Sequence, residues 1–250
     1  SASLIMDIIM ENTFGGTGQE KEADGYRTSM KEVKHNKSYD LGELLTRVIS
    51  LSCFNFVVEP IKLLLEERIT LKIQNKLDEL LRRFSLGIYK NEDSTKQDML
   101  VLCFELFKES EKDFTSHRRE PTMKDSEKHF LVQLSSKSQR VVNENSVYVD
   151  TFQRLSLELL RTTLNKNPNF INAECLSGFI PFFEVALESE NEAVITSALK
   201  ILEKTIHVDF DSEGDIFKSA ARKCLNIIKN FPSTESEIVQ SCFKYLSVVI

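Results

Sequence analysis

A glycine-rich stretch near the amino terminus is the first place where this sequence could bind a phosphate group. Residues 15–21 read GGTGQEK. A phosphate-binding P-loop needs GxxxxGK followed by Ser or Thr, between a strand and a helix, so that backbone amides surround the phosphate. Here Gly18 is followed by Gln19 and Glu20, and an acidic side chain repels phosphate. The GxGxxG spacing is missing as well. We therefore interpret the stretch as a loop that interrupts a helix, with no cofactor bound.

Other reactive side chains lack the spacing of a metal centre or a catalytic site. No histidine has another His, a Cys or a carboxylate at ligand spacing. The five cysteines are never closer than 18 residues, which excludes a CxxC motif. Three of them, Cys103, Cys224 and Cys242, lie in apolar helical patterns, which is typical of buried thiols. We predict no catalysis, no metal and no small-molecule substrate.

Lysines in the following polar stretch are the best candidates for contacting nucleic acid. Lys31, Lys34 and Lys37 recur every three residues, which places them on one side of a helix if the segment is helical. Such a row can neutralise backbone phosphates without reading bases. Arg82 and Arg83 form a second, weaker patch. The alternative interpretation is a solvated helix face. The net charge of −6 excludes a globally basic nucleic-acid binder but allows a local patch.

The elements that must position these residues are expected to be helices. Only 8 glycines and 5 prolines occur in 250 residues, fewer than a sandwich or barrel would need for its turns. Hydrophobic residues make up 41% and charged residues 28%, as in globular proteins. No signal peptide and no run of about 18 apolar residues is present, so we expect a soluble chain without a membrane segment. The chain starts without Met and is expected to be a piece of a longer one.

Apolar periodicity divides the chain into five regions. We predict the end of a preceding helical repeat at 1–13, a polar insertion at 14–40, irregular helical repeats at 41–112, a loop or insertion at 113–146, and regular HEAT-like repeats at 147–250. In the first region Leu4, Ile5, Ile8 and Ile9 share one helical face, which we expect to pack on a segment that precedes this chain.

Local signals predict where helices start in the first half. Asp40 would cap a helix, with Glu43 completing a capping box. Pro60 would open the next helix, because proline is tolerated in a first turn but not in an interior. Residues 70–90 form a clear amphipathic pattern, and residues 96–112 form another.

The second half contains an internal repeat. The predicted helices span 147–166, 175–188, 192–207, 216–230 and 236–250. Residues 192–202 align with 236–246 at an offset of 44, and residues 152–160 align with 194–202 at an offset of 42. The shared pattern is bulky, small, bulky, and the small position is Ser156, Ala198 or Cys242, which should let neighbouring helices approach closely. This period is typical of HEAT and armadillo repeats and predicts an all-α solenoid. A generic helical bundle with coincident periodicity is the alternative.

Two strings in the first half also resemble a known family. Residues 13–40 read TFGGTGQEKEADGYRTSMKEVKHNKSYD, and residues 76–91 read KLDELLRRFSLGIYKN. They resemble the very large HEAT-repeat protein of the small-subunit processome, the Down-Regulated-In-Metastasis family. No generic helix requires such strings, and the span 13–91 that contains them is about a third of the chain.

The resemblance implies a nucleolar, non-catalytic scaffold that supports ribosome assembly and small-subunit pre-rRNA processing. It implies other processome proteins, pre-ribosomal RNA and a small nucleolar ribonucleoprotein as partners. The alternative interpretation belongs to another class: the chain would be a HEAT-repeat adaptor for nuclear transport or trafficking that binds peptides or a small GTPase. Whether the 14–40 segment contacts RNA or protein stays open between these interpretations.

Overall fold

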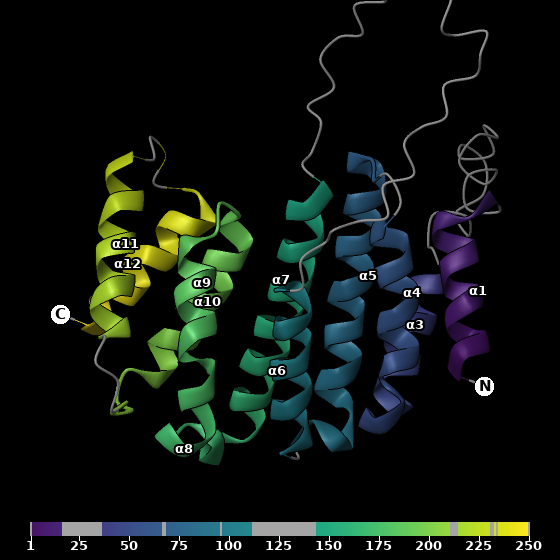
Figure 1. The fold of residues 1–250 in the computed structure, drawn as a ribbon, viewed down its shortest axis with the longest axis horizontal. Coiled ribbons are helices and arrows are strands. Elements are labelled where there is room, and N and C mark those ends of the chain that lie inside the picture. The colour runs from purple at the N-terminus through teal and green to yellow at the C-terminus, as the bar shows by residue number, and fades with distance from the viewer. Residues whose placement is uncertain are drawn as a thin grey trace, which may run out of the picture.

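The described part of the chain is built from helices that lie side by side. A computed structural model describes residues 2–16, 37–66, 69–95, 97–111, 144–210, 215–230, 233 and 235–249. Regular secondary structure in these ranges is helical, and no strand occurs in them. The stack runs from α1 (Ala2–Phe14) at one end to α11 (Ile216–Asn230) and α12 (Glu237–Val249) at the other (Figure 1). Within these ranges no helix is both long and apolar enough to cross a membrane.

Successive helices alternate between two layers. The first layer contains α1, α4 (Asn55–Glu66), α6 (Asp98–Ser110), α9 (Ile180–Glu188) and α11. The second layer contains α3 (Lys37–Val48), α5 (Leu71–Lys90), α7 (Glu144–Lys166), α10 (Glu192–Thr205) and α12. In the second layer α3 packs on α5, α5 on α7, α7 on α10 and α10 on α12. This arrangement is an α-solenoid of HEAT-like helical pairs, as predicted.

Short helical turns occupy the links between these helices. They are η3 (Leu51–Cys53), η4 (Glu92–Thr95), η5 (Pro168–Phe170), α8 (Ala173–Leu176) and η6 (Ser177–Phe179).

The three helices aligned by the internal repeat, α7, α10 and α12, are neighbours in the second layer. Their small residues, Ser156, Ala198 and Cys242, are fully buried. Ser156 Oγ donates a hydrogen bond to the Cys103 carbonyl oxygen of α6 at 2.6 Å, and Cys242 interacts with Cys224 of α11. The small position of these two helices therefore allows close approach to the first helix of the same pair.

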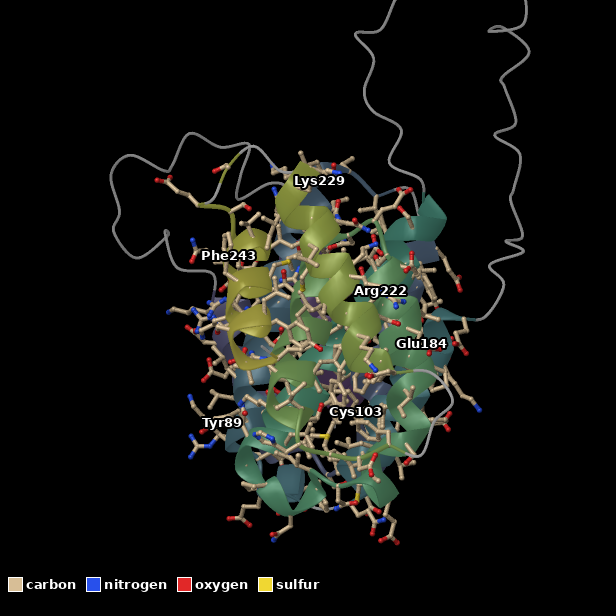
Figure 2. The ribbon with its side chains drawn as sticks, turned by 90° about the vertical axis from the view of Figure 1, so that its left-hand side faces the viewer. Tyr89, Cys103, Glu184, Arg222, Lys229 and Phe243 are labelled. Carbon is tan, nitrogen blue, oxygen red and sulfur yellow. The ribbon has the colours of Figure 1, made fainter. Side chains whose placement is uncertain are left out.

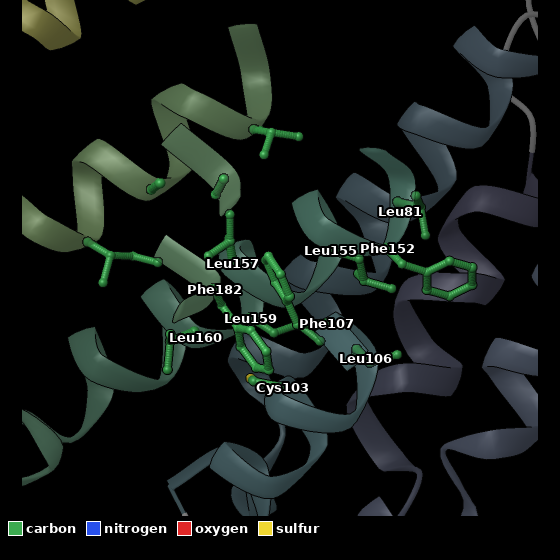
Figure 3. Packing of buried hydrophobic residues seen from close by; sticks show 14 of the residues in the cluster. Leu81, Cys103, Leu106, Phe107, Phe152, Leu155, Leu157, Leu159, Leu160 and Phe182 are labelled. Atoms are coloured by element: carbon green, nitrogen blue, oxygen red, sulfur yellow. The ribbon is translucent and has the colours of Figure 1, made fainter. Parts of the chain in front are cut away.

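Buried side chains of neighbouring pairs form one continuous core. Around α6, α7 and α9 the packing brings together Cys103, Phe107, Phe152, Leu155 and Phe182 (Figure 3). The rings of Phe107 and Phe182 stack with centroids 4.3 Å apart, which joins α6 to α9. The predicted burial of Cys103, Cys224 and Cys242 is confirmed.

Two predicted helix starts in the first half are wrong. Helix α3 begins at Lys37, so Asp40 lies within its first turn and is not the cap of a capping box. Helix α4 begins at Asn55 and contains Pro60 in its interior. Val57 and Val58 precede the proline and are buried, so their removal from water favours the longer helix although Pro60 lacks an amide hydrogen.

The structure also bears on three further predictions. In α1 the buried residues are Met6, Ile9 and Thr13, whereas Leu4 and Ile8 are exposed, so the expected packing of Leu4 and Ile8 on a preceding segment stays a prediction. The single helix predicted over 175–188 is divided into α8, η6 and α9, because Pro181 favours the first turn of a new helix. The predicted helix over 70–90 is confirmed as α5, whose cap Thr70 accepts a hydrogen bond from the Ile73 amide.

Candidate functional site

A cluster of charged side chains joins α3 to α5 on the second layer. Arg83 Nη1 lies 3.3 Å from Asp40 Oδ1 and 3.2 Å from Glu43 Oε2, while its Nε donates to Glu79 Oε1 at 3.1 Å. Glu43 also accepts a hydrogen bond from Lys90 Nζ. One arginine of α5 therefore holds both acidic residues of α3.

The basic side chains favour the ionised form of Glu43 and of Glu79. Hydrogen bonds from Arg82 and Arg83 lower the pKa of Glu79 to about 2. The Lys90 ammonium, followed by Arg83, lowers the pKa of Glu43 below its usual value. The pKa of both guanidinium groups is raised in turn, chiefly by hydrogen bonds to Glu79. The surface thus carries fixed charges of both signs at neutral pH.

The structure places the sequence-predicted contact residues as follows. Lys31 and Lys34 lie outside the described residues. Lys37 opens α3 and is exposed, one turn before Asp40. The Arg82 side chain is 53% exposed and that of Arg83 is 23% exposed. The two basic patches, more than 40 residues apart in sequence, belong to helices that pack side by side.

Sequence reasoning missed two members of this surface, Lys90 and Tyr89. Lys90 follows Arg83 by seven residues, a spacing that places both on one face of α5, and this signal could have been used. Tyr89 is 50% exposed, and Lys166 Nζ of α7 lies 5.3 Å from the centre of its ring. An exposed aromatic ring among cations can stack against a nucleobase.

Polar contacts continue across the rest of the second layer. Arg154 of α7 lies 3.1 Å from Asp78 of α5. Ser197 of α10 donates to Glu158 of α7 at 2.8 Å. Lys200 of α10 pairs with Glu237 of α12 at 2.8 Å. Each adjacent pair of helices in this layer is therefore bridged by a polar contact, although exposed pairs of this kind each stabilise little.

The first layer has a different charge. Helices α1, α4, α6 and α9 together carry two lysines, Lys62 and Lys108, against nine carboxylates: Asp7, Glu11, Glu59, Glu66, Asp98, Glu105, Glu109, Glu184 and Glu188. Helix α11 is basic and is the exception. Figure 2 shows Glu184 on one side of the stack and Tyr89 on the other. The two faces of the solenoid therefore suit partners of different charge.

Nothing among the described residues suggests chemistry. No group of three or more His, Cys, Asp or Glu in those ranges could hold a metal ion. Burial raises the pKa of the Cys103 thiol, which disfavours the nucleophilic thiolate. The fold and its charged faces together define a class: a HEAT-like helical repeat array that offers surfaces for binding.

Comparison with known proteins shows which proteins this chain is similar to. Residues 1–107 match the family model described as the U3 small nucleolar RNA-associated protein 20 domain. The chain is 46% identical over 256 residues to U3 small nucleolar RNA-associated protein 20 of Saccharomyces cerevisiae, with 100% of the chain covered. It is 31% identical over 253 residues to the protein of that name in Schizosaccharomyces pombe, with 98% covered. The chain spans 10% of the length of each relative.

Proposed function

We propose that this chain is a section of a non-catalytic scaffold that acts in small-subunit ribosome biogenesis, in the nucleolus, as part of the small-subunit processome. The observation that carries the proposal is the 46% identity across the whole chain to a protein named for its association with U3 small nucleolar RNA. The HEAT-like array supports it, because stacked helical pairs present long surfaces for several partners. The resemblance to the Down-Regulated-In-Metastasis family stays part of this proposal, and the comparisons do not favour a transport or trafficking adaptor.

Purification of the full-length protein from its own cells tests this proposal. Mass spectrometry and RNA sequencing of the co-isolated material should find processome proteins, U3 small nucleolar RNA and small-subunit pre-rRNA. Recovery of transport receptors or a small GTPase without these RNAs would reject the proposal in favour of the adaptor.

Within this function, the α3–α5 side of the second layer is the proposed RNA contact. Lys37, Arg82 and Lys90 offer exposed positive charge there, and Tyr89 offers a ring for stacking. Lys31 and Lys34 precede α3 in the chain and complete the predicted basic row. Arg83 is engaged by three carboxylates, so we expect it to position the two helices more than to contact phosphate.

Charge reversal tests whether RNA contacts this surface in particular or is attracted to any basic patch of the protein. The full-length protein with Lys31→Glu, Lys34→Glu and Lys37→Glu should crosslink to pre-rRNA about tenfold less, because each lost phosphate contact weakens binding and its salt dependence. The matched control reverses Lys218, Arg222 and Lys229 of α11, which are exposed at the far end of the array. Undiminished crosslinking of the first variant, or an equal loss in the control, contradicts the proposed contact.

A further inference from the structure

An open groove lies where α7 meets α9 and the link between α9 and α10. Its volume is about 900 Å³, within the range of about 300–1,000 Å³ that ligand-binding pockets occupy. The lining residues come from α7 (Ser146, Val149, Asp150, Gln153), α9 (Glu184, Val185, Glu188) and the link (Ser189, Glu190, Asn191). Glu184, on its wall, lies on the opposite side of the stack from Tyr89 (Figure 2). The groove is therefore separate from the surface proposed to contact RNA.

The groove combines acidic and apolar walls. The residues that line the groove include four carboxylates and no basic side chain. Glu188 lies near one cation outside the lining, Lys223 of α11, with 3.9 Å between Lys223 Nζ and Glu188 Oε2. Val185 is 43% exposed, and Val149 of α7 lines the groove with it. A phosphate backbone would be repelled here. A chain segment with positive charges on long aliphatic stems complements both walls.

Gln153 gives a second, independent sign of a ligand. Only 3% of this residue is exposed, yet its side-chain amide makes no hydrogen bond to any residue that the structure describes. The amide stays accessible from the groove, because the buried side-chain atom without a partner in the described ranges is Thr13 Oγ1. A glutamine amide offers both a donor and an acceptor to a ligand there. One peptide unit of an extended chain can satisfy both through its carbonyl oxygen and its amide hydrogen.

Asp150 is held in place beside Gln153. Asn191 Nδ2 lies 3.1 Å from Asp150 Oδ2, and Ser189 Oγ lies 3.5 Å from Oδ1. Burial raises the pKa of this carboxyl group, and the nearby Glu190 charge adds to the effect. A cation in the groove would offset both effects, because opposite charge favours the ionised carboxylate.

We propose that this groove binds an extended, Lys/Arg-rich segment of a partner protein. The backbone of the bound segment hydrogen-bonds to the Gln153 amide, and the aliphatic stems of its Lys and Arg side chains pack on Val149 and Val185. The positive charges of the segment face the surrounding carboxylates. The site goes beyond the proposed scaffold function and does not depend on it.

Fluorescence anisotropy with a defined probe tests the site. The probe is an acetylated and amidated peptide, KVRKVK, carrying fluorescein, titrated with the 250-residue chain. Glu184→Lys with Glu188→Lys should weaken binding at least about tenfold, because attraction becomes repulsion. Gln153→Leu should weaken binding by about tenfold without a change in charge, the ratio expected for one lost hydrogen-bonding group. Gln153→Met provides a second variant of similar volume if the first one unfolds.

A matched control distinguishes this groove from general attraction to an acidic chain. Glu66→Lys with Glu105→Lys changes net charge equally and alters exposed residues of α4 and α6. It should leave the affinity within about twofold, as for distant surface charges. Circular dichroism checks that each variant is folded. Absence of binding by the wild-type chain, an equal loss in the control, or unchanged affinity in the folded Gln153 variant overturns the proposal.

Discussion

At the scale of single residues, Glu79 shows how strongly the second-layer surface depends on paired charges. It accepts hydrogen bonds from Arg82 at 2.6 and 2.8 Å and from Arg83 at 3.1 Å. These bonds stabilise the carboxylate and lower its pKa from 4.5 to about 2. A carboxyl group whose pKa is lower in the folded state stabilises the protein above its unfolded pKa.

Glu79→Gln should therefore reduce the acid sensitivity of folding. In the wild-type chain the stabilisation by Glu79 is fully present above pH 4.5 and is lost as the pH falls towards 2. The variant lacks this contribution at every pH, so the two free energies of unfolding should converge on acidification. Urea unfolding across this pH range measures the difference. The control is Glu184→Gln, which removes a carboxylate that forms no ion pair with the residues that the structure describes. If its pH profile matches that of Glu79→Gln, the arginine cluster is not the cause.

At the scale of elements, α3 and α5 are held at close range by small and polar residues. Thr46 Oγ1 of α3 donates a hydrogen bond to the Phe84 carbonyl oxygen of α5, over 3.2 Å. The buried Asn91 amide donates to the carbonyl oxygens of Thr46 and Ile49, which satisfies the end of α3. Gly87 lets the helix backbones meet, because an added Cβ would overlap the Glu43 carbonyl oxygen and Thr46 Oγ1.

Gly87→Ala should destabilise the chain by about 1–3 kcal/mol, the usual cost of overpacking a close contact. The effect opposes the helix propensity of alanine, which alone would favour the variant by about 1 kcal/mol. Urea denaturation followed by circular dichroism measures it. Gly178→Ala is the control, since its added Cβ would meet Phe104 at 3.6 Å, an ordinary contact. A neutral or stabilising Gly87→Ala would show that the α3–α5 contact is looser than described.

At the scale of the whole molecule, the stack depends on interfaces between adjacent helical pairs. Phe182 of α9 stacks on Phe107 and also contacts Phe104, both on α6 of the preceding pair. In repeat proteins the coupling between neighbours decides whether the array unfolds as one unit. This aromatic group therefore links α6 to α9 of the following pair.

Phe182→Ala should lower the free energy of unfolding by about 3–5 kcal/mol, as for other fully packed aromatic side chains. Because the loss falls on an interface between pairs, we also expect urea unfolding to separate into two steps. Hydrogen exchange should then show α9 to α12 opening before α3 to α7. Phe243→Ala, at a position 46% exposed on α12, should leave a single transition. A single transition in Phe182→Ala would place the coupling elsewhere.

From the amino-acid sequence alone we could predict the fold class, most helix positions and the internal repeat, and could find the family resemblance. These follow from periodicity and literal strings, which are local properties of the chain. Errors arose where packing outweighed local preference, as when buried valines extended α4 ahead of Pro60.

The surfaces of the molecule depend on how the helices pack, which the sequence pattern does not give. Arg83 meets Asp40 and Glu43 because two helices pack side by side, and no spacing within either helix indicates that contact. Gln153 looks like any other helical glutamine until neighbouring elements place it in the wall of a groove. Pairwise contacts between distant segments depend on the geometry of the stack, so the sequence pattern alone could not predict them.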